Sequence, residues 1–449
     1  MRKKVKILSI CFLVTGLVII SLLPSMAAAQ KIRLVFEQWF YGDPKIGPVV
    51  DWYINEFQKK HPNVEIKPTS ISNEMYWNKL AVDIASNTEG DIIALDTGAG
   101  INGYYRLRPG GAFINLDDYI KGCILEDGTS LENDIMLMDS DQLKRDGHYI
   151  ALPHNWFIAE NIAYRKSHFR DAGVTPEDIK TWEGLKEAAV KLTRDIDGDG
   201  TIDRYGFGHP VYPEVLSRWW HMHWLWTAGG GIFPKEKPPY TAENLIFNSP
   251  ENVFATEYLA DLVKKANPPG NKKLFELIPM FYEGNLSMVP IAVWTIELLQ
   301  MNMKPEGSWK TDLGLVTFPA VNYQGKLRQP VYVVWSNPLA ISSRCKYPDI
   351  AFEFIAFIHS KEVQRRISVW SAPVNKVVLS EFYKKDHPLQ YKFIEMSQGF
   401  ETRLVPDIPQ WNEFDHIIQQ AMNAALLGLK SPKEALDWAQ SEMAKALEK

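Results

Sequence analysis

The chain has 449 residues, of which 46% are hydrophobic and 23% are charged, and its formal net charge is −5. This length is enough for two or three domain-sized units with a large buried core. A mildly acidic chain without a basic tract argues against nucleic acid or an anionic membrane surface as its partner.

The first 29 residues have the pattern of an export signal. Four basic residues open the chain, an apolar run follows over Ile7–Leu23, and three alanines ending at Ala29 form an A-x-A cleavage site. We therefore predict a signal peptide over residues 1–29 and a mature chain that starts at Gln30, in a periplasm or secreted. Cleavage removes four positive charges and no negative ones, which takes the net charge from −5 to −9.

Two other fates of this segment are disfavoured by its composition. An uncleaved membrane anchor would need a longer apolar run, and this one is interrupted by Ser9, Thr15 and Gly16. Cys11 follows Ile10 and lies too early for lipid attachment, so the chain has no lipobox. No later segment is long and apolar enough to cross a bilayer, and we expect no membrane insertion after cleavage.

Strands and helices alternate through the first part of the mature chain. The pattern predicts strands over Ile32–Phe36, Val64–Lys67 and Asp91–Leu95, and helices over Val49–Lys60 and Tyr76–Ser86. The last strand is a continuous apolar run, as expected of a parallel strand buried on both faces. Strands that alternate with helices form βαβ units and predict an α/β fold with a doubly wound, mostly parallel sheet flanked by helices.

The same criteria predict the later elements. Strand-like runs are expected at Tyr149–Pro153, Leu286–Trp294, Asp312–Phe318 and Val331–Ile341. Helices are expected at Leu185–Thr193, Val253–Lys265, Asp349–Phe357, Lys361–Ser368, Asp415–Leu427 and Pro432–Ala446. The last helix has a clear start signal, with Ser431 as its cap and a proline at its first position.

One stretch is more specific than the others. FYEGNLSMVPIAVW over Phe281–Trp294 joins a helix end, Gly284, a strand and a tryptophan. This order resembles the second lobe crossing of extracellular solute-binding proteins of ABC importers, family 1, in their sugar-binding, maltose-binding-protein-like branch. The order "helix, F-x-K-K-H-P-x-V-x-I, helix, D-I-I" is similar to the amino-terminal lobe of that family. The resemblance covers nearly all of the mature chain.

The resemblance implies a type II periplasmic-binding-protein fold with two lobes and three hinge crossings. The crossings would be Tyr149–Pro153, Leu286–Trp294 and Val331–Ile341. Lobe 1 would comprise residues 30–150 plus 291–335, and lobe 2 residues 151–290 plus 336–449. The protein would be a monomer and not an enzyme. It would capture a carbohydrate by hinge closure and deliver it to the membrane permease of an ABC importer.

A cleft between two lobes is lined by residues at strand ends and crossings. Indole rings cover the apolar C–H faces of a sugar, while carboxylates, amides and indole N–H groups satisfy its hydroxyls. The chain has 15 tryptophans. The alternative role for each candidate is structural, as a core tryptophan or, for the carboxylate, as a cap. The candidate ligand-binding residues are Trp39, Tyr41, Asp96, Asn155, Trp156, Trp294, Trp335, Trp370 and Trp411.

Two further aromatic features bear on this site. SRWWHMHWLW carries four tryptophans, Trp219, Trp220, Trp224 and Trp226, which we interpret as a packed helix of the second lobe. Asp415 falls where maltose-binding proteins carry a stacking aromatic residue, so the resemblance does not carry that subsite over.

The ligand class is open at this point. The many aromatic candidates favour an oligosaccharide. The acidic charge and Asp96 leave room for a different solute, a polyol phosphate or a polyamine. A secreted glycoside hydrolase is the remaining alternative, because an acid/base pair of carboxylates has no sequence signature. The chain has no G-x-S-x-G, H-E-x-x-H, P-loop or Rossmann motif, which favours binding without chemistry.

The segment DIDGDGTIDRYG at 195–206 matches the first half of an EF-hand loop. Gly206 stands at position 12, where a bidentate glutamate belongs. We expect either a weak structural Ca²⁺ site or an Asp/Gly-rich turn without metal, and no required cofactor. The candidate ligands are Asp195, Asp197, Asp199 and Asp203.

Cysteine and histidine offer little further chemistry. Cys123 and Cys345 are the two cysteines of the mature chain. Export permits a disulfide, but we expect two buried thiols. His221 and His223 are two residues apart, which places them on different faces of a helix and makes them a poor zinc pair.

Overall fold

The structure is a computed structural model that describes residues 31–448 apart from 100, 137, 139 and 213–216. The export signal predicted at 1–29 lies outside these residues. Within the described part of the chain, one eight-stranded sheet runs in the order β2-β1-β3-β11-β6-β7, with β8 on β6 and β12 on β11. Its strands are β1 (Ile32–Glu37), β2 (Val64–Pro68), β3 (Ile92–Ala94), β6 (Leu152–Arg165), β7 (Met288–Ala292), β8 (Leu313–Val316), β11 (Val331–Ile341) and β12 (Glu401–Arg403).

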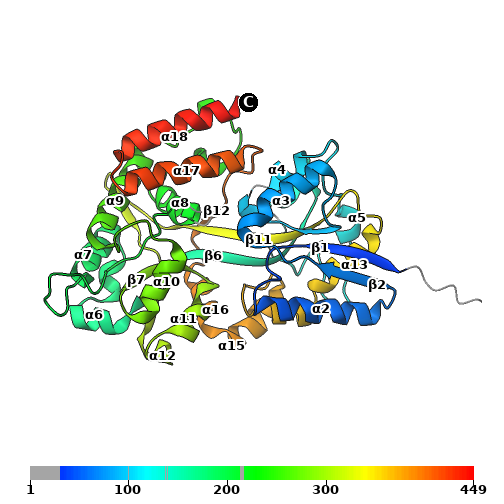
Figure 1. Ribbon diagram of the computed structural model, residues 1–449, viewed down its shortest axis with the longest axis horizontal. Helices are drawn as coiled ribbons and strands as arrows, with labels where there is room; N and C mark the ends of the chain where they lie inside the picture. Colours follow the sequence, from blue (N-terminus) through cyan, green and yellow to red (C-terminus); the bar gives the residue numbers. More distant parts are fainter. Residues whose placement is uncertain (1–30, 100, 137, 139, 213–216, 449) are drawn as a thin grey trace, which may run out of the picture.

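Helices cover this sheet in both lobes (Figure 1). The first lobe carries α2 (Ile46–Lys60), α3 (Asn73–Ser86), α4 (Ile101–Arg106), α5 (Asp117–Ile120), α13 (Pro348–Ile358) and α14 (Lys361–Ile367). The second carries α6 (Lys166–Ala172), α7 (Trp182–Leu192), α8 (Ser217–Thr227), α9 (Pro250–Ala266), α10 (Leu274–Glu283), α11 (Thr295–Asn302), α12 (Trp309–Asp312), α16 (Pro388–Met396), α17 (Trp411–Leu426) and α18 (Pro432–Leu447). The short helix α15 (Lys384–Asp386) lies between α14 and α16. The remaining strands form two short hairpins, β4 (Lys144–Arg145) with β5 (His148–Tyr149) and β9 (Val321–Tyr323) with β10 (Lys326–Arg328).

The first lobe is built on the parallel strands β2, β1 and β3. Along β3, Ile92 and Ala94 belong to the main core, whereas Ile93 joins a second core under α3 and α4. Successive side chains of a strand point to opposite faces, so both faces of this sheet are buried. That explains why the strand reads as an unbroken apolar run, as the sequence predicted.

Two long strands connect the lobes. β6 and β11 pair antiparallel, from Val333 with Ala159 in the second lobe to Leu339 with Leu152 in the first. Every residue of β6 is buried. Figure 1 shows both strands crossing the middle of the molecule. The predicted crossings near Tyr149–Pro153 and at Val331–Ile341 therefore correspond to observed ones.

The crossing predicted at Leu286–Trp294 is wrong. β7 pairs with β6 along Ala159–Tyr164, so it is a strand of the second lobe. β8 pairs with the same part of β6. Much of the segment 291–335 therefore belongs to the second lobe and not to lobe 1. The remaining crossing is the segment between α14 and α16. α14 packs on α2 of the first lobe, and α16 contacts α11 of the second lobe. A βαβ pattern predicts strands well but does not say which lobe each strand joins.

The parallel pairing is also more limited than predicted. β11 is antiparallel to β3 and β6, and β6 is antiparallel to β7 and β8. Parallel pairs occur in β2-β1-β3 and between β11 and β12. The chain returns along β11 in the direction opposite to β6, which makes the middle of the sheet antiparallel.

Glu160 is an unusual core residue. It lies at an irregularity of β6 between Ala159 and Asn161. Both carboxylate oxygens are buried and have no hydrogen-bond partner among the described residues. Burial raises the pKa of Glu160 well above its ordinary value, because the ionised form loses its hydration. Burial therefore favours the protonated form of Glu160 in the folded protein.

We predict that Glu160→Gln becomes more stable relative to the wild type as the pH rises. The folded state holds this proton more tightly than the unfolded chain, whose glutamate ionises near 4.5. The contribution of Glu160 to the free energy of unfolding therefore falls above that pH, by up to about 1.4 kcal/mol per pH unit. Urea denaturation at about pH 5 and about pH 8 measures the difference. Glu187→Gln, on the exposed face of α7, is the control and should follow the wild type. A Glu160→Gln profile parallel to that of the wild type contradicts the prediction.

Candidate functional site

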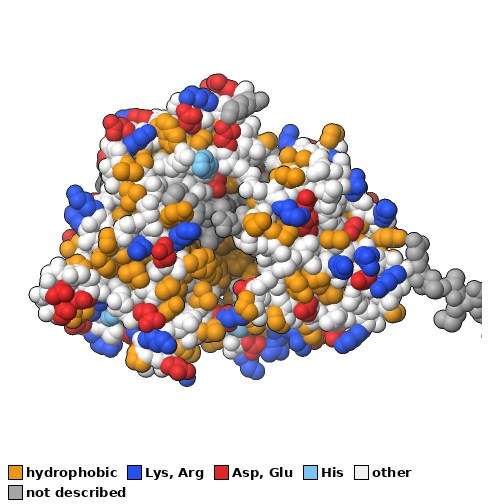
Figure 2. Space-filling view, in the orientation of Figure 1, with side chains coloured by type: hydrophobic (Ala, Val, Ile, Leu, Met, Phe, Trp, Pro, Cys, Tyr) orange, Lys and Arg blue, Asp and Glu red, His pale blue; other side chains and the backbone are white. Residues whose placement is uncertain are grey.

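An aromatic stack lies where β6 and β11 pass between the lobes. Trp335 of β11 stacks with Trp219 of α8, with ring centroids 5.5 Å apart and planes at 10°. It also stacks with Phe157 of β6, at 5.2 Å and 20°. Figure 2 shows a hollow between the two lobes with hydrophobic side chains along its base. The stack places flat apolar surfaces at the junction of the lobes.

The stack continues into the first lobe. Trp370, which follows α14, lies 5.7 Å from Phe157 and 5.7 Å from Phe40. Phe40 contacts Trp39 at 5.5 Å, and Trp39 packs on Trp77 of α3 at 4.7 Å. Rings from both lobes thus form one connected row. Three of the predicted residues, Trp39, Trp335 and Trp370, belong to it.

Trp156 lies on the other face of β6. Trp335 pairs with Phe157, and Ser336 pairs with Trp156. Paired residues point to the same face of a sheet and successive residues point to opposite faces. The indole Nε1 of buried Trp156 donates a hydrogen bond to the carbonyl of Pro373 at 3.0 Å. Trp156 is therefore a packing residue in this arrangement, and its neighbour Phe157 holds the place beside Trp335.

Asn337 connects two further predicted residues. Its backbone N–H donates to Oδ1 of Asn155 at 3.1 Å, and its side-chain amide donates to Oδ2 of Asp96 at 3.4 Å. The other oxygen of Asp96 accepts the backbone N–H of Gly98 at 2.6 Å. Asp96 therefore stabilises the turn after β3, which is the structural role that the sequence analysis gave as its alternative. It also lies beside β11, where that strand crosses between the lobes.

Gly98 is a point of contact between the lobes. It lies in a short 3₁₀ turn (Thr97–Ala99) after β3, and its carbonyl accepts the indole N–H of Trp411 at 2.9 Å. A Cβ atom at this position would lie 1.9 Å from Cζ2 of Trp219. Both tryptophans belong to second-lobe helices. The absence of a side chain at Gly98 therefore lets the two lobes approach this closely.

Several buried donors lie near this junction. Five of them have no hydrogen-bond partner among the described residues: the side-chain amide of Asn155, the hydroxyls of Ser336 and Ser371, and the indole N–H groups of Trp220 and Trp370. Ser336 lines a cavity of about 30 Å³ together with Trp335, which is room for about one water molecule. Unpaired buried donors are costly, so they favour an oxygen-rich ligand or ordered water at the junction.

Tyr41 and Trp294 are two of the predicted residues that lie outside the connected row. The hydroxyl of Tyr41 donates to Asp51 at 2.7 Å, and this hydrogen bond raises the pKa of Tyr41. Trp294 lies just before α11, two residues beyond the end of β7, and its ring is 5.7 Å from Phe275 of α10. Among the described side chains, no ring contact joins Trp294 to the stack.

Sequence reasoning missed Phe40, Phe157 and Asn337 and assigned Trp219 to packing. Strand parity was the available signal for Phe157, because it shares its face with the residue opposite on β11. Trp219 gave no such signal, since the described residues of α8 from 219 onward are all buried and the helix has no polar face to orient it. Gly98 and Asn337 act through the backbone and a turn, which a single sequence does not reveal.

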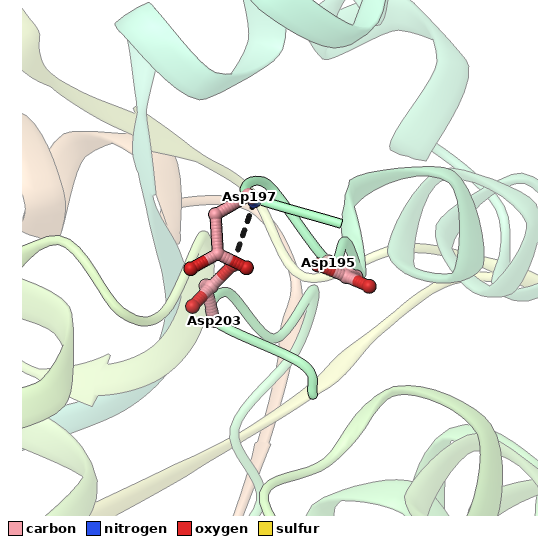
Figure 3. A group of neighbouring side chains, drawn as sticks. All are labelled: Asp195, Asp197 and Asp203. Atoms are coloured by element: carbon pink, nitrogen blue, oxygen red, sulfur yellow. Dashed lines mark hydrogen bonds between the residues drawn. The ribbon is translucent and has the colours of Figure 1, made fainter. Parts of the chain in front are cut away.

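The acidic loop holds three carboxylates close together. Carboxylate oxygens of Asp195, Asp197 and Asp203 lie within 4.8 Å of one another (Figure 3), and Asp199 is not part of this group. Asp203 also accepts the backbone N–H of Ile196 at 2.6 Å, and Asp195 accepts that of Gly200 at 2.8 Å.

The twelfth position of this loop has no room for a glutamate. A Cβ atom on Gly206 would lie 1.8 Å from the carbonyl oxygen of Ala189. The bidentate ligand of an EF-hand therefore has no place here, and any Ca²⁺ ion would depend on the three clustered aspartates.

The two cysteines, together with His221 and His223, are not members of the aromatic stack. Cys123 and Cys345 are both free and half-buried, and burial raises the pKa of Cys345 to about 12. His221 lies 3.0 Å from His209, ring nitrogen to ring nitrogen, while His223 packs edge-on against Phe318. Burial lowers the pKa of both His221 and His223 to about 3, so both are neutral.

Among the described helices, none combines the length and apolar character that a membrane span needs.

Comparison with solved structures shows the fold. A substrate-binding protein of an ABC transporter from Listeria monocytogenes, solved with cycloalternan, is 21% identical and superposes with a TM-score of 0.73, covering 93% of this chain and 100% of that one. A solute-binding protein from Agrobacterium radiobacter, solved with ribitol, is 24% identical with a TM-score of 0.72, covering 93% and 98%. These likenesses confirm the two-lobe type II fold.

Sequence comparison agrees. An uncharacterized ABC transporter extracellular-binding protein of Pyrococcus horikoshii is 23% identical over 424 residues, which is 92% of this chain and 87% of that protein. The family model described as bacterial extracellular solute-binding protein matches residues 46–365. This match spans both lobes and the strands that connect them. The chain belongs to the family of bacterial extracellular solute-binding proteins.

Proposed function

We propose that this protein captures a carbohydrate or polyol between its lobes and delivers it, as a monomer outside the cytoplasm, to the permease of an ABC importer. The observation that carries the proposal is the aromatic stack around Trp335, which joins rings of both lobes at their junction. Indole and phenyl faces match the C–H faces of a sugar. The buried donors of Asn155 and Ser336 match its hydroxyl oxygens.

The ligands of related proteins support an uncharged, hydroxylated molecule. The Listeria protein was solved with a cyclic oligosaccharide and the Agrobacterium protein with an open-chain polyol. These two differ widely in size but share a high density of hydroxyl groups. The proposed ligand class for this chain is defined by that shared chemistry.

Capture without chemistry follows from how the lobes meet. Closure brings Gly98 of the first lobe against Trp219 and Trp411 of the second. A ligand that contacts both lobes stabilises this arrangement relative to the open one, while a ligand on one lobe alone shifts nothing. Such a cycle needs no catalytic residue, and we propose that the protein is not an enzyme.

We predict that a hydroxylated ligand raises the melting temperature of the mature protein from Gln30. At 100 times the dissociation constant, a ligand that binds the folded state alone stabilises it by about 2.7 kcal/mol. For a chain of this length that corresponds to a shift of about 3 °C. A panel of mono- and oligosaccharides and polyols, cycloalternan and ribitol included, tests this by thermal unfolding.

The panel also separates the alternatives. Putrescine and glycerol phosphate stand for cationic and phosphorylated solutes, and a shift with these alone would contradict the proposed ligand class. Chromatography of the sugars after the assay detects turnover, and loss of an oligosaccharide would indicate a glycoside hydrolase.

We predict that Gly98→Ala weakens ligand binding by tenfold or more, equivalent to at least about 1.4 kcal/mol. The added methyl group would lie 1.9 Å from the Trp219 ring and 2.9 Å from Oδ1 of Asp96. Opening the lobes relieves the closer contact, with Trp219, and a small shift of the Asp96 side chain relieves the other. Calorimetric titration with a sugar selected from the panel measures the loss.

Gly103→Ala is the matched control for this variant. Its methyl group would meet the carbonyl of Pro409 at 3.4 Å, an ordinary contact, so we expect an unchanged dissociation constant. Equal affinities of Gly98→Ala and the wild type would show that closure does not need this approach.

We also propose that the loop at 195–203 binds Ca²⁺ weakly. The three clustered carboxylates support this role, since Ca²⁺ takes oxygen ligands and millimolar affinity is typical of exterior sites. We predict that Ca²⁺ at about 5 mM raises the melting temperature of the wild type but not of Asp203→Asn. Mg²⁺ at the same concentration is the control, because it prefers a smaller, octahedral site. No difference between the two ions, or between the two proteins, would identify the loop as a turn without metal.

A further inference from the structure

An ion pair joins the two lobes away from the aromatic stack. Nζ of Lys45 lies 3.0 Å from Oε1 of Glu297, and both side chains are about one-third exposed, at 35% and 31%. Lys45 directly precedes α2 of the first lobe. Glu297 lies in the first turn of α11, which follows β7 in the second lobe. Nζ of Lys45 also lies 2.7 Å from the sulfur of Met301 on the same helix.

The loop that presents Lys45 is held in place within the first lobe. Oδ1 of Asp43 accepts the backbone N–H groups of Lys45 and Ile46 at 2.8 and 3.2 Å. The N–H of Gly47 donates to the carbonyl of Asp43 at 2.8 Å, and a Cβ on Gly47 would lie 2.6 Å from the carbonyl of Tyr41. A compact loop positions the lysine with little loss of backbone freedom when the lobes meet.

The partner helix is fixed on its own side. Gln390 of α16 donates to Gln300 of α11 at 3.1 Å. α11 also packs on α10 and β7. Both halves of the ion pair are thus anchored in different lobes, so the distance between their charges follows the motion of one lobe relative to the other.

We propose that Lys45 and Glu297 form an electrostatic latch that favours the closed arrangement and slows release of the bound ligand. The latch rests on the proposed function for its effect on release, whereas its effect on closure does not depend on any ligand. Neither residue belongs to the aromatic stack or to the polar groups around Asn337, so the pair acts on the lobes and not on the ligand.

Distances between spin labels test the latch without a ligand. Val82 on α3 and Val190 on α7 are exposed residues of the first and second lobes, at 64% and 45%. Both are changed to Cys for labelling, in a full mature chain that carries Cys123→Ser and Cys345→Ser. We expect Lys45→Glu and Glu297→Lys each to lengthen the mean distance. The double charge reversal should restore it, because the attraction returns with opposite signs. About 1 M salt should lengthen the distance in the parent chain, since it screens exposed charges.

A matched ion pair within one lobe is the control. Lys186 of α7 lies 2.9 Å from Asp261 of α9, with both side chains about one-third exposed. Lys186→Glu should leave the distance between lobes unchanged, although it removes an ion pair of similar exposure. A distance that changes as much in Lys186→Glu, or that is unchanged in both single reversals, would overturn the latch.

Ligand release gives the second readout. With a sugar identified by thermal unfolding, we expect Lys45→Glu to speed dissociation about fivefold, as for a partly exposed pair worth up to about 1 kcal/mol. The double reversal should return the rate to that of the wild type. Single reversals that lengthen the label distance but leave release unchanged would confine the latch to closure and overturn its role in retention. A protein that binds no sugar yet shows the expected distances would contradict the proposed function and not the closure.

Discussion

The pairing of β6 with β11 is the constraint on which the rest of the molecule depends. These strands are the ones that run through both lobes, and their register sets what lies at the junction. Trp335 opposite Phe157 places two flat rings side by side, and the Asn337 N–H reaches Asn155 one step further along. A shift of one residue would turn every side chain to the opposite face and replace Phe157 by Trp156. The junction is therefore specified by the backbone before any side chain contributes.

The same strands are irregular at two places, one at the junction of the lobes and one just inside the second lobe. The register of β11 on β6 shifts between Ser336 and Pro338, and that of β6 on β7 shifts between Ala159 and Asn161. Irregular pairing leaves fewer ladder hydrogen bonds to break when strands bend. Ser336 and Asn155 keep unpaired donors at this point, and Glu160 keeps an unpaired carboxyl group nearby. The middle of the sheet therefore combines continuity along the chain with local freedom to bend.

Local patterns predicted the elements of this fold better than their partners. The first lobe, β11 and the final helix follow from periodicity, caps and breakers, all of which act over a few residues. The site was harder to predict, because its members meet through pairing between distant strands. Trp335 could be found as an aromatic residue at a crossing, whereas the prediction for Trp294 relied on a crossing that β7 does not make, because β7 returns to β6. Gly98 contributes because it has no side chain, which leaves space for Trp219. No pattern within one sequence shows which glycine the other lobe will approach.

Two kinds of contact close the molecule, and they differ in range. The approach of Trp219 to Gly98 depends on van der Waals contact, which loses about a quarter to a half of its strength when a gap of about 0.5–1 Å opens. The attraction of Lys45 for Glu297 falls off over the Debye length, about 8 Å at physiological ionic strength. As the lobes move together, the charges act first and the rings fit last. The ion pair therefore aligns the lobes while the cleft is still open to solvent. The contact between Gly98 and Trp219 forms only if the ligand in the cleft allows full closure.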